Sequence, residues 1–484
     1  MLLPRSPYLA SLALQVITTF ASPTSSANAT IETIDRDVVV IGGGSSGTYT
    51  AIRLQQLGKS VAVVEKQNRL GGHVNTYVDY FTNTTFDYGV IIMVNITVVR
   101  DYFAYLDIPM GTFQGYVPNQ QTLYADFASE TNVSTMYNDA QVAAAVLGYA
   151  AQLEKYSYLS SGYHLPDPIP KDLLLPFGTF LEKYNLTALA YTIWYINEGA
   201  GDILAQPTLY MLKYFGLLQA QGLAGVSGMQ FVNANNDYQS LYNSALTHLG
   251  EDTNAFLDSV PTNVHRNDTG VSVRVATPTG EKLIRAKKLV VSIPPKIQEL
   301  APFLDMTSNE QALFSQFNNS FHYAVVVGNT GFPPDALIEN LNPKAPADLP
   351  PMPAAYAFAP TPVEGLHIVW CGTSHYEPVA QIKTAILEAA RAVQRTYNYT
   401  SPEAGGPKII QFRDHSPTQL EVSVEAIKDR FYDKLNALQG DMNTFWTGAT
   451  WESHSSSAIW NFTEYEVLPK ILESVIHMDW LCFL

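Results

Sequence analysis

Basic residues are scarce in this chain of 484 residues. Lysine and arginine together number 28, against 44 aspartates and glutamates, and the formal net charge is −16 at pH 7. The sequence contains no block of basic residues. A phosphate backbone is repelled by such a chain rather than bound, so we expect no nucleic-acid partner.

Cysteine is rarer still, since Cys371 and Cys482 are the only two. They can form at most one disulfide, and a chain of this length does not need one to fold. Neither Cys-x-x-Cys nor His-Glu-x-x-His occurs. The common zinc patterns therefore lack their ligands, and we expect no metal site. Cys371 lies in an apolar run and is expected to be an inert core residue.

Long hydrophobic runs are also missing. The N-terminus has Arg5, a mostly apolar stretch from Tyr8 to Ala21, and small polar residues up to Ala29, which is the order of a secretory signal peptide. The apolar stretch is shorter than the roughly 20 residues that a helix needs to cross a bilayer. We predict a signal peptide over residues 1–29, no stable membrane insertion, and a secreted or secretory-pathway lumenal protein.

Sites for N-glycosylation support the same route. The sequence Asn-X-Ser/Thr is the acceptor for oligosaccharides in the secretory pathway. It occurs nine times, at Asn28, Asn83, Asn95, Asn132, Asn185, Asn267, Asn318, Asn398 and Asn461. We therefore expect a glycoprotein.

The clearest positive signal begins at a β-branched run, residues 37–41, which ends at the glycine-rich segment 42–47. Apolar residues at helical spacing follow, and residues 61–64 form a second β-branched run. This order predicts a strand, a tight turn, a helix and a second strand. With 46% hydrophobic residues, the chain is also long enough for two domains.

The turn has the spacing Gly-x-Gly-x-x-Gly of a dinucleotide-binding unit. There Gly42 permits the tight turn, Gly44 lets the backbone approach a pyrophosphate, and Gly47 lets the helix pack closely. The free N–H groups at the helix start, near Ser46, favour an anion. The same residues also match Gly43-x-Ser45-x-Gly47, the nucleophile elbow of hydrolases. The segment that follows favours the dinucleotide-binding interpretation.

That segment starts with Glu65 at the end of the second strand, where a carboxylate accepts hydrogen bonds from ribose hydroxyls. Gly71 and Gly72 follow as a doublet that brings a second backbone loop to the pyrophosphate. Arg69, just before the doublet, offers charge-assisted hydrogen bonds to it.

This extended fingerprint resembles that of the flavin-containing amine oxidase superfamily. Residues 289–295 resemble its later strand, and residues 445–449, Phe-Trp-Thr-Gly-Ala, resemble its C-terminal flavin motif. The sequence is most similar to the fungal β-cyclopiazonate dehydrogenase-like group of FAD-dependent oxidoreductases in residues 71–77, in residues 87–89 and in the segments around 446 and 468. The resemblance implies that FAD is the cofactor and that Trp446, Thr447 and Gly448 contact it.

The resemblance also implies an α/β fold in which an FAD/NAD(P)-binding Rossmann-like domain is interleaved with an α+β substrate-binding domain. Residues 35–97, 231–297 and 405–476 would form the FAD-binding domain. Residues 98–230, expected to be helical, and residues 298–404 would form the substrate-binding domain.

Two positions depart from the superfamily pattern. His73 stands where many amine oxidases have arginine after the doublet, and Thr450 stands where they often have an acidic residue. Three roles are open for His73: a hydrogen bond to the cofactor, a covalent attachment point for the flavin, or a structural role. Asp87 is either a turn-capping carboxylate or a functional one. The sequence names no catalytic base.

The expected chemistry is transfer of a hydride from a C–N or C–C bond of a mostly apolar small molecule to the flavin, in secondary metabolism. No second Gly-x-Gly-x-x-Gly follows a later strand, so the sequence does not indicate a site for NADPH. Molecular oxygen is therefore the expected electron acceptor. Three rivals are a redox-neutral fatty-acid double-bond isomerase, a secreted flavoprotein that has lost its activity, and an NAD-dependent dehydrogenase.

Overall fold

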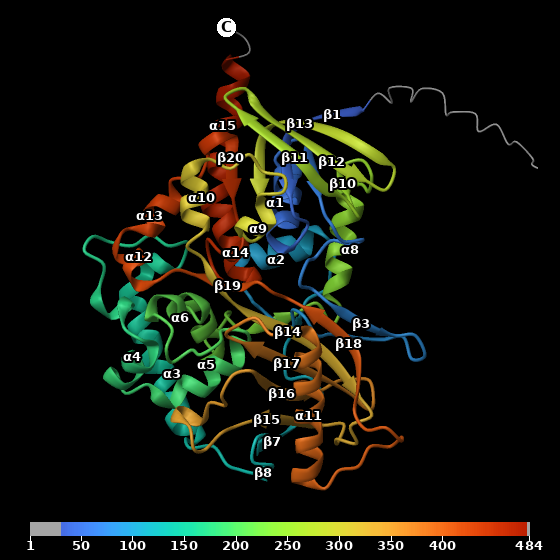
Figure 1. The fold of residues 1–484 in the computed structure, drawn as a ribbon, viewed down its shortest axis with the longest axis vertical. Helices are drawn as coiled ribbons and strands as arrows, with labels where there is room; N and C mark the ends of the chain where they lie inside the picture. The colour runs from blue at the N-terminus through green and yellow to red at the C-terminus, as the bar shows by residue number, and fades with distance from the viewer. Residues whose placement is uncertain (1–30, 482–484) are drawn as a thin grey trace, which may run out of the picture.

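The β-branched run at 37–41 is the centre of the first of two large sheets (Figure 1). The computed structural model describes residues 31–481. In it β1 (Glu32–Ile41) lies between β2 (Val61–Val64) and β13 (Gly280–Val291) and runs parallel to both. Val38, Val39 and Val40 are fully buried, because a parallel strand is covered on both faces.

Further strands extend this first sheet on both sides. On the parallel side are β10 (Ala255–Phe256), beside β2, and β20 (Thr444–Trp446), beside β13. On the other side β13 continues into an antiparallel meander with β12 (Gly270–Thr277) and β11 (Val260–Asn267). The helices around this sheet are α1 (Ser45–Gln56), α2 (Thr97–Tyr105), α8 (Tyr238–Leu249), α14 (Ser456–Phe462) and α15 (Leu468–Leu481).

The second large sheet forms the domain that we expect to bind the substrate, and we call it the substrate-binding sheet. Its strands, in spatial order, are β18 (Lys408–Asp414), β14 (Asn318–Gly328), β17 (Leu366–Thr373), β16 (Ala354–Pro360), β15 (Ala336–Asn340), β7 (Gln121–Asp126) and β8 (Thr131–Asn132), with β19 (Thr418–Glu421) on the end of β14. The long amphipathic helix α11 (Val379–Tyr397) covers one face. Its apolar side, including Ile382, Ile386 and Val393, belongs to a separate buried cluster.

A layer of short helices lies beside this second sheet, at the lower left of Figure 1. Its members are α3 (Asp139–Leu153), α4 (Phe177–Lys183), α5 (Ala190–Ile196), α6 (Thr208–Tyr214) and α7 (Leu217–Leu223). Four others, α9 (Ile297–Leu300), α10 (Ser308–Phe314), α12 (Val424–Lys428) and α13 (Phe431–Asn436), connect the two domains. Two small sheets complete the fold: the hairpin of β3 (Thr76–Asp79) with β4 (Thr84–Asp87), and β9 (Phe231–Asn233) between β5 (Met93–Val94) and β6 (Gly111–Thr112).

The interleaved α/β architecture agrees with the prediction, but two of its boundaries differ. Residues 405–421 were expected in the FAD-binding domain, whereas β18 and β19 pair with β14 of the substrate-binding sheet. The segment 98–230 is not wholly helical, since β7 pairs with β15 and β8 with β7. A strand's partner is chosen by tertiary packing, which local sequence pattern does not encode.

Several predictions fall on residues outside the described part of the chain. The signal peptide over 1–29, the sequon at Asn28 and Cys482 all lie there. Within residues 31–481, every helix is too short or too polar to span a membrane. Cys371 is buried in β17 and unpaired, and burial raises the pKa of its thiol to about 12, so it is an inert core residue as expected.

Candidate functional site

The turn between β1 and α1 has the geometry that the glycine spacing predicts. Gly42 has a φ of +101°, and a Cβ there would lie 2.7 Å from the side chains of Ile293 and Ser292. A Cβ on Gly47 would lie 2.0 Å from the Gly42 carbonyl oxygen. Both positions therefore require glycine for the fold itself.

Gly44 differs from these two glycines. A Cβ on it would meet only the Cα of Gly72, at 3.9 Å, so space is open above it. Gly44 is also the N-cap of α1, and no side chain caps that helix end. An uncapped helix start with open space before it presents free N–H groups and the positive end of the helix dipole to an anion. The residues thus fit a pyrophosphate.

The hydrolase interpretation of the same turn fails on the surroundings of Ser45. Its hydroxyl donates to Ser456 Oγ at 2.9 Å and accepts from the indole N–H of Trp460 at 3.0 Å. Within residues 31–481, no histidine is bonded to Ser45. A serine nucleophile needs such a base to take its proton.

Glu65 lies directly against this turn. Its carboxylate accepts from the backbone N–H of Gly43 at 2.6 Å and of Gln67 at 2.8 Å. Only 5% of the residue is exposed. In this structure Glu65 therefore joins the first glycine loop to the loop after β2, at the end of the strand where a ribose is expected.

The glycine doublet forms the second backbone loop of the site. Gly71 and Gly72 both have positive φ, and a Cβ on Gly72 would lie 3.0 Å from the Gly44 Cα. Arg69 braces the doublet from behind, donating to the Gly72 carbonyl at 3.0 Å and to Asn75 Oδ1 at 3.1 Å. The guanidinium is thus committed to protein acceptors, and its role in this structure is to hold the loop rather than to reach an anion.

His73 follows the doublet and belongs to a group of four histidines. Its ring stacks on His415 at 4.3 Å between centroids, 7° from parallel, and His415 lies 5.6 Å from His322. Burial lowers the pKa of His73 to about 4 and that of His322 to about 3. We call His73, His322, His415 and His454 the histidine group.

Two members of the histidine group have exposed side chains although protein surrounds them. His73 and His454 are both exposed, yet burial lowers the pKa of His454 to about 3 and that of His73 to about 4. Four uncharged imidazoles therefore lie where the glycine doublet meets the substrate-binding sheet.

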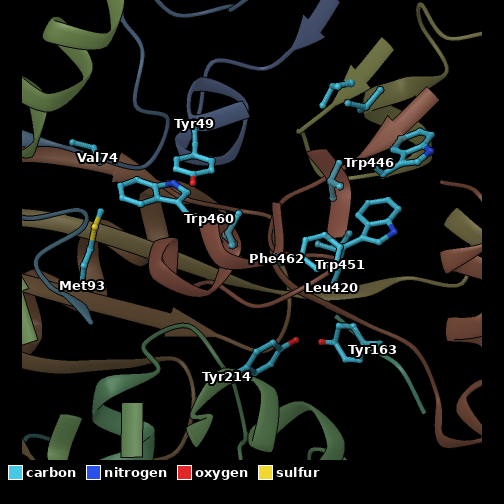
Figure 2. Packing of buried hydrophobic residues seen from close by; sticks show 14 of the residues in the cluster. Tyr49, Val74, Met93, Tyr163, Tyr214, Leu420, Trp446, Trp451, Trp460 and Phe462 are labelled. Carbon is cyan, nitrogen blue, oxygen red and sulfur yellow. The ribbon is translucent and has the colours of Figure 1, made fainter. Parts of the chain in front are cut away.

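His454 reaches the histidine group from the C-terminal motif. Its Nε2 accepts from the backbone N–H of Gln419 at 2.7 Å, and its ring lies edge-on to Tyr214 at 6.3 Å. Trp460, in α14 after the same motif, packs face to face with Tyr49 at 5.3 Å (Figure 2). Trp460 is therefore a core residue.

The C-terminal motif is brought to the start of α1. A Cβ on Gly448, whose φ is +108°, would lie 3.3 Å from Ser46 Oγ, so these two predicted site residues are neighbours. Thr447 is buried, and its hydroxyl is 2.7 Å from that of Thr463. Thr450 is buried as well.

Trp446 is placed differently from the expectation that it contacts the cofactor. Its indole has no exposed surface. It packs on Trp451 at 5.4 Å (Figure 2). It also lies edge-on to Phe314 at 5.0 Å. In this structure its side chain is therefore a core residue, because β20 turns it away from the glycine loops.

Of its two possible roles, Asp87 has the structural one, that of a capping carboxylate. Its carboxylate accepts from the backbone N–H of Tyr238 at 3.1 Å and from the hydroxyl of Thr76. Burial raises its pKa to about 7. Asp87 thus satisfies the first turn of α8, as a capping carboxylate does.

His322 and His415 were not identified from the sequence. They lie on β14 and after β18, far along the chain from the doublet, and no local motif marks them. Only the pairing of β18 with β14 brings them to His73.

Comparisons with known proteins identify the family and its cofactor. Residues 40–106 match the family described as NAD(P)-binding Rossmann-like domain. The chain is 42% identical to the FAD-dependent oxidoreductase oblC of Cochliobolus heterostrophus, over 91% of this chain and 92% of that one. It is 34% identical to beta-cyclopiazonate dehydrogenase of Aspergillus oryzae, over 92% and 94%.

Solved structures share the fold. A fatty acid isomerase from P. acnes superposes with a TM-score of 0.72 at 17% identity, covering 90% of this chain and 98% of that one. A putrescine oxidase variant superposes with a TM-score of 0.61 at 14% identity, covering 91% and 100%. With the glycine loops, Glu65 and relatives above 30% identity over nine-tenths of the chain, the protein belongs to the family of fungal FAD-dependent oxidoreductases that includes beta-cyclopiazonate dehydrogenase.

Proposed function

We propose that this FAD-dependent oxidoreductase is an oxidase of a mostly apolar small molecule, acting in secondary metabolism. It would remove a hydride from a C–N or C–C bond, and molecular oxygen would take the electrons. The observation that carries the proposal is the uncapped start of α1 with open space at Gly44, beside the glycine doublet and the stacked rings of His73 and His415.

Each part of the site has a role in this proposal. The N-terminus of α1, with Gly44, Ser46 and Gly47, would hold the pyrophosphate, Glu65 the ribose, and Gly71, Gly72 and Gly448 would allow close backbone approach. FAD supplies the hydride acceptor when it is bound. The protein supplies orientation and excludes water.

The histidine group would provide uncharged ring nitrogens at the reacting end of the site. Because His73, His322 and His454 have pKa values of about 4, 3 and 3, they are neutral at physiological pH. A neutral imidazole can accept a hydrogen bond from substrate or donate one to it. His73 is exposed and next to the doublet, so it is the member that we assign to cofactor contact.

A test of the oxygen step needs no knowledge of the substrate. The flavin of the purified holoprotein is photoreduced without air, and the solution is mixed with aerated buffer while absorbance and hydrogen peroxide are followed. We expect reoxidation faster than that of free FAD under the same conditions, with one peroxide per flavin. Reoxidation no faster than free FAD would favour a dehydrogenase with another acceptor, or a redox-neutral isomerase.

We also propose that the protein passes through the secretory pathway. Of the eight sequons within residues 31–481, six asparagines are exposed, and Asn95 and Asn461 are partly exposed. All eight side chains are thus accessible to modification. Expression in a filamentous fungus with residues 1–29 intact should give protein in the medium or lumen whose mobility rises after endoglycosidase treatment. Unmodified protein in the cytosol would contradict the proposal.

A further inference from the structure

His415 lies where the substrate-binding sheet meets the glycine doublet. It directly follows β18, and its backbone N–H donates to the His322 carbonyl at 2.9 Å. Its ring stacks face to face on that of His73, 4.3 Å between centroids, and His73 is the residue after Gly72. His415 is buried. A nearly parallel pair of imidazoles therefore lies at the end of the loop that fits FAD.

One ring nitrogen of His415 is bonded to the buried side chain of Asn75. The amide nitrogen of Asn75, Nδ2, is 2.8 Å from His415 Nε2 and 2.9 Å from the His73 carbonyl oxygen. The amide oxygen, Oδ1, accepts from Arg69 Nη2 at 3.1 Å and from Arg413 Nε at 3.2 Å. Asn75 thus joins the doublet loop to the end of β18.

The partners of Asn75 fix the orientation of its amide. A guanidinium group can only donate hydrogen bonds, and a backbone carbonyl can only accept them. The amide oxygen must therefore face Arg69 and Arg413, and the amide NH2 must face the His73 carbonyl. The reverse orientation would place N–H groups against N–H groups and one oxygen against another. Three contacts besides the one to His415 thus determine which end of the amide meets the imidazole.

This orientation determines where His415 carries its hydrogen. An amide NH2 donates and does not accept, so His415 Nε2 must be the acceptor and carries no hydrogen. An imidazolium ion has a hydrogen on both ring nitrogens and does not fit. His415 is therefore uncharged, with its hydrogen on Nδ1. Burial, then the rings of His73 and His322 and the two guanidinium groups, lowers the pKa of His415 well below its usual range, in agreement with this geometry.

The Nδ1–H of His415 is left as a donor with no acceptor. Among the described residues, none accepts a hydrogen bond from it. Unlike Nδ1 of His322, it is not one of the fully buried atoms without a partner, so it retains accessible surface. A donor whose direction is fixed by a second hydrogen bond, and which is itself unpaired, is arranged to meet an acceptor on a ligand.

We propose that Asn75 is a positioning residue that holds His415 in this form, and that the Nδ1–H of His415 donates a hydrogen bond to the ring of the bound flavin. The inference deepens the proposed function, since it rests on FAD binding but not on the substrate or the electron acceptor. It adds to His73 a second histidine that contacts the cofactor.

The flavin ring fits this donor better than the phosphates of FAD do. A phosphate is an anion, and an anion favours the imidazolium form, which Asn75 excludes. The polar edge of an oxidised flavin ring instead has carbonyl oxygens and unprotonated nitrogens, which accept hydrogen bonds and carry no full charge. An uncharged N–H meets such an acceptor without bringing an ion into a buried place.

The first measurement is NMR of the ring nitrogens in holoprotein labelled at histidine, at pH 7. The chain has ten histidines, and the His415 signals are identified by their loss in His415→Gln. We expect a hydrogen on Nδ1 and none on Nε2. Removal of FAD should move the Nδ1–H signal, because the acceptor is lost.

A variant then tests the role of Asn75. In Asn75→Asp the carboxylate still accepts from Arg69 and Arg413 but has no hydrogen to donate. Nε2 of His415 should therefore gain a hydrogen, seen in the same spectrum. Asn243→Asp is the matched control, since Asn243 is an exposed residue of α8 and the same exchange there should leave the His415 signals unchanged.

The contact to the flavin is tested by its midpoint potential, measured against a reference dye. Reduction adds electron density to the accepting atoms, so a donor favours the reduced form. His415→Leu should lower the ratio of reduced to oxidised flavin at a fixed potential about tenfold, which equals about 30 mV for a two-electron couple. His415→Gln, which keeps an N–H donor, should lower it less than about threefold. The flavin content of each variant is checked first.

Three results would overturn the inference. The first is a hydrogen on Nε2 of His415 in the wild-type holoprotein, and the second is an Nδ1–H signal that does not move when FAD is removed. Neither needs a variant that must fold and retain FAD. The third is an equal midpoint potential in the wild-type protein and His415→Leu. No measurement involves oxygen or turnover, so slow flavin reoxidation would refute the proposed oxidase and leave this inference standing.

Discussion

Gly44 and Gly47 lie in the same turn, yet the structure predicts opposite consequences for an added methyl group. In Gly44→Ala the new Cβ meets nothing closer than the Gly72 Cα at 3.9 Å. The backbone at Gly44 is extended, with φ of −70° and ψ of −172°, which alanine adopts freely. In Gly47→Ala the Cβ lies 2.0 Å from the Gly42 carbonyl oxygen and 2.5 Å from Ser292 Oγ.

The magnitudes follow from these contacts. Gly44→Ala should cost less than about 1 kcal/mol of folding free energy, the usual effect of exchanging these residues at an N-cap. Its methyl group occupies the space in front of the helix N–H groups, so one hydrogen bond to a charged phosphate is lost, about 1.5–3 kcal/mol or roughly 10- to 150-fold in FAD affinity. Gly47→Ala should cost about 1–3 kcal/mol or more in stability through overpacking.

The assay measures two quantities on each purified variant: flavin per polypeptide from absorbance, with FAD titration of the apoprotein, and the urea midpoint of unfolding of the apoprotein. We expect Gly44→Ala to fold like the wild-type protein and to lose FAD, and Gly47→Ala to unfold at lower urea whether or not FAD is added. Gly44→Ala with wild-type FAD affinity would refute the assignment of this turn as the pyrophosphate site.

Three further predictions concern buried charge and protonation. Burial lowers the pKa of His322 to about 3, so between pH 6.5 and 3 only the unfolded chain binds its proton, and the free energy of unfolding decreases as the pH is lowered. His322→Gln should make this decrease smaller by about 1.4 kcal/mol per pH unit, measured from urea midpoints at pH 7 and 5. An unchanged slope would contradict the buried, neutral ring. Lys213→Met leaves the carboxylate of Glu452 buried without its partner at 2.6 Å and should lower the free energy of unfolding by about 3–5 kcal/mol. Adding Glu452→Gln to the same chain should restore part of this loss. A loss below about 1 kcal/mol would count against the buried ion pair. Glu65→Ala removes the acceptor of the Gly43 and Gln67 N–H groups and should lower the free energy of unfolding by about 1–3 kcal/mol. It should also lower the affinity for FAD. Both effects are measured by thermal melting with and without added FAD, and an unchanged melting temperature would contradict this role.

The predictions that held depend on residues close together in the sequence. The local sequence from Asp37 to Val64 determines the structure of this unit. Its β-branched residues form a strand buried on both faces, and a Cβ at Gly42 or Gly47 would collide with neighbouring atoms. These constraints act over a few residues, so the letters alone identify the turn, the helix and the strand end at Glu65. Family resemblance extended this identification to the FAD cofactor and the interleaved domains.

The residues that the sequence did not identify are brought together by strand pairing. His415 reaches His73 because β18 pairs with β14. Trp446 turned into the core for the same kind of reason, since its place in β20 beside β13 decides which way the side chain points. A side chain's neighbours across a sheet depend on register and packing. The sequence by itself therefore determined the nucleotide-binding turn, whereas the tertiary structure alone decided which distant histidines lie beside it.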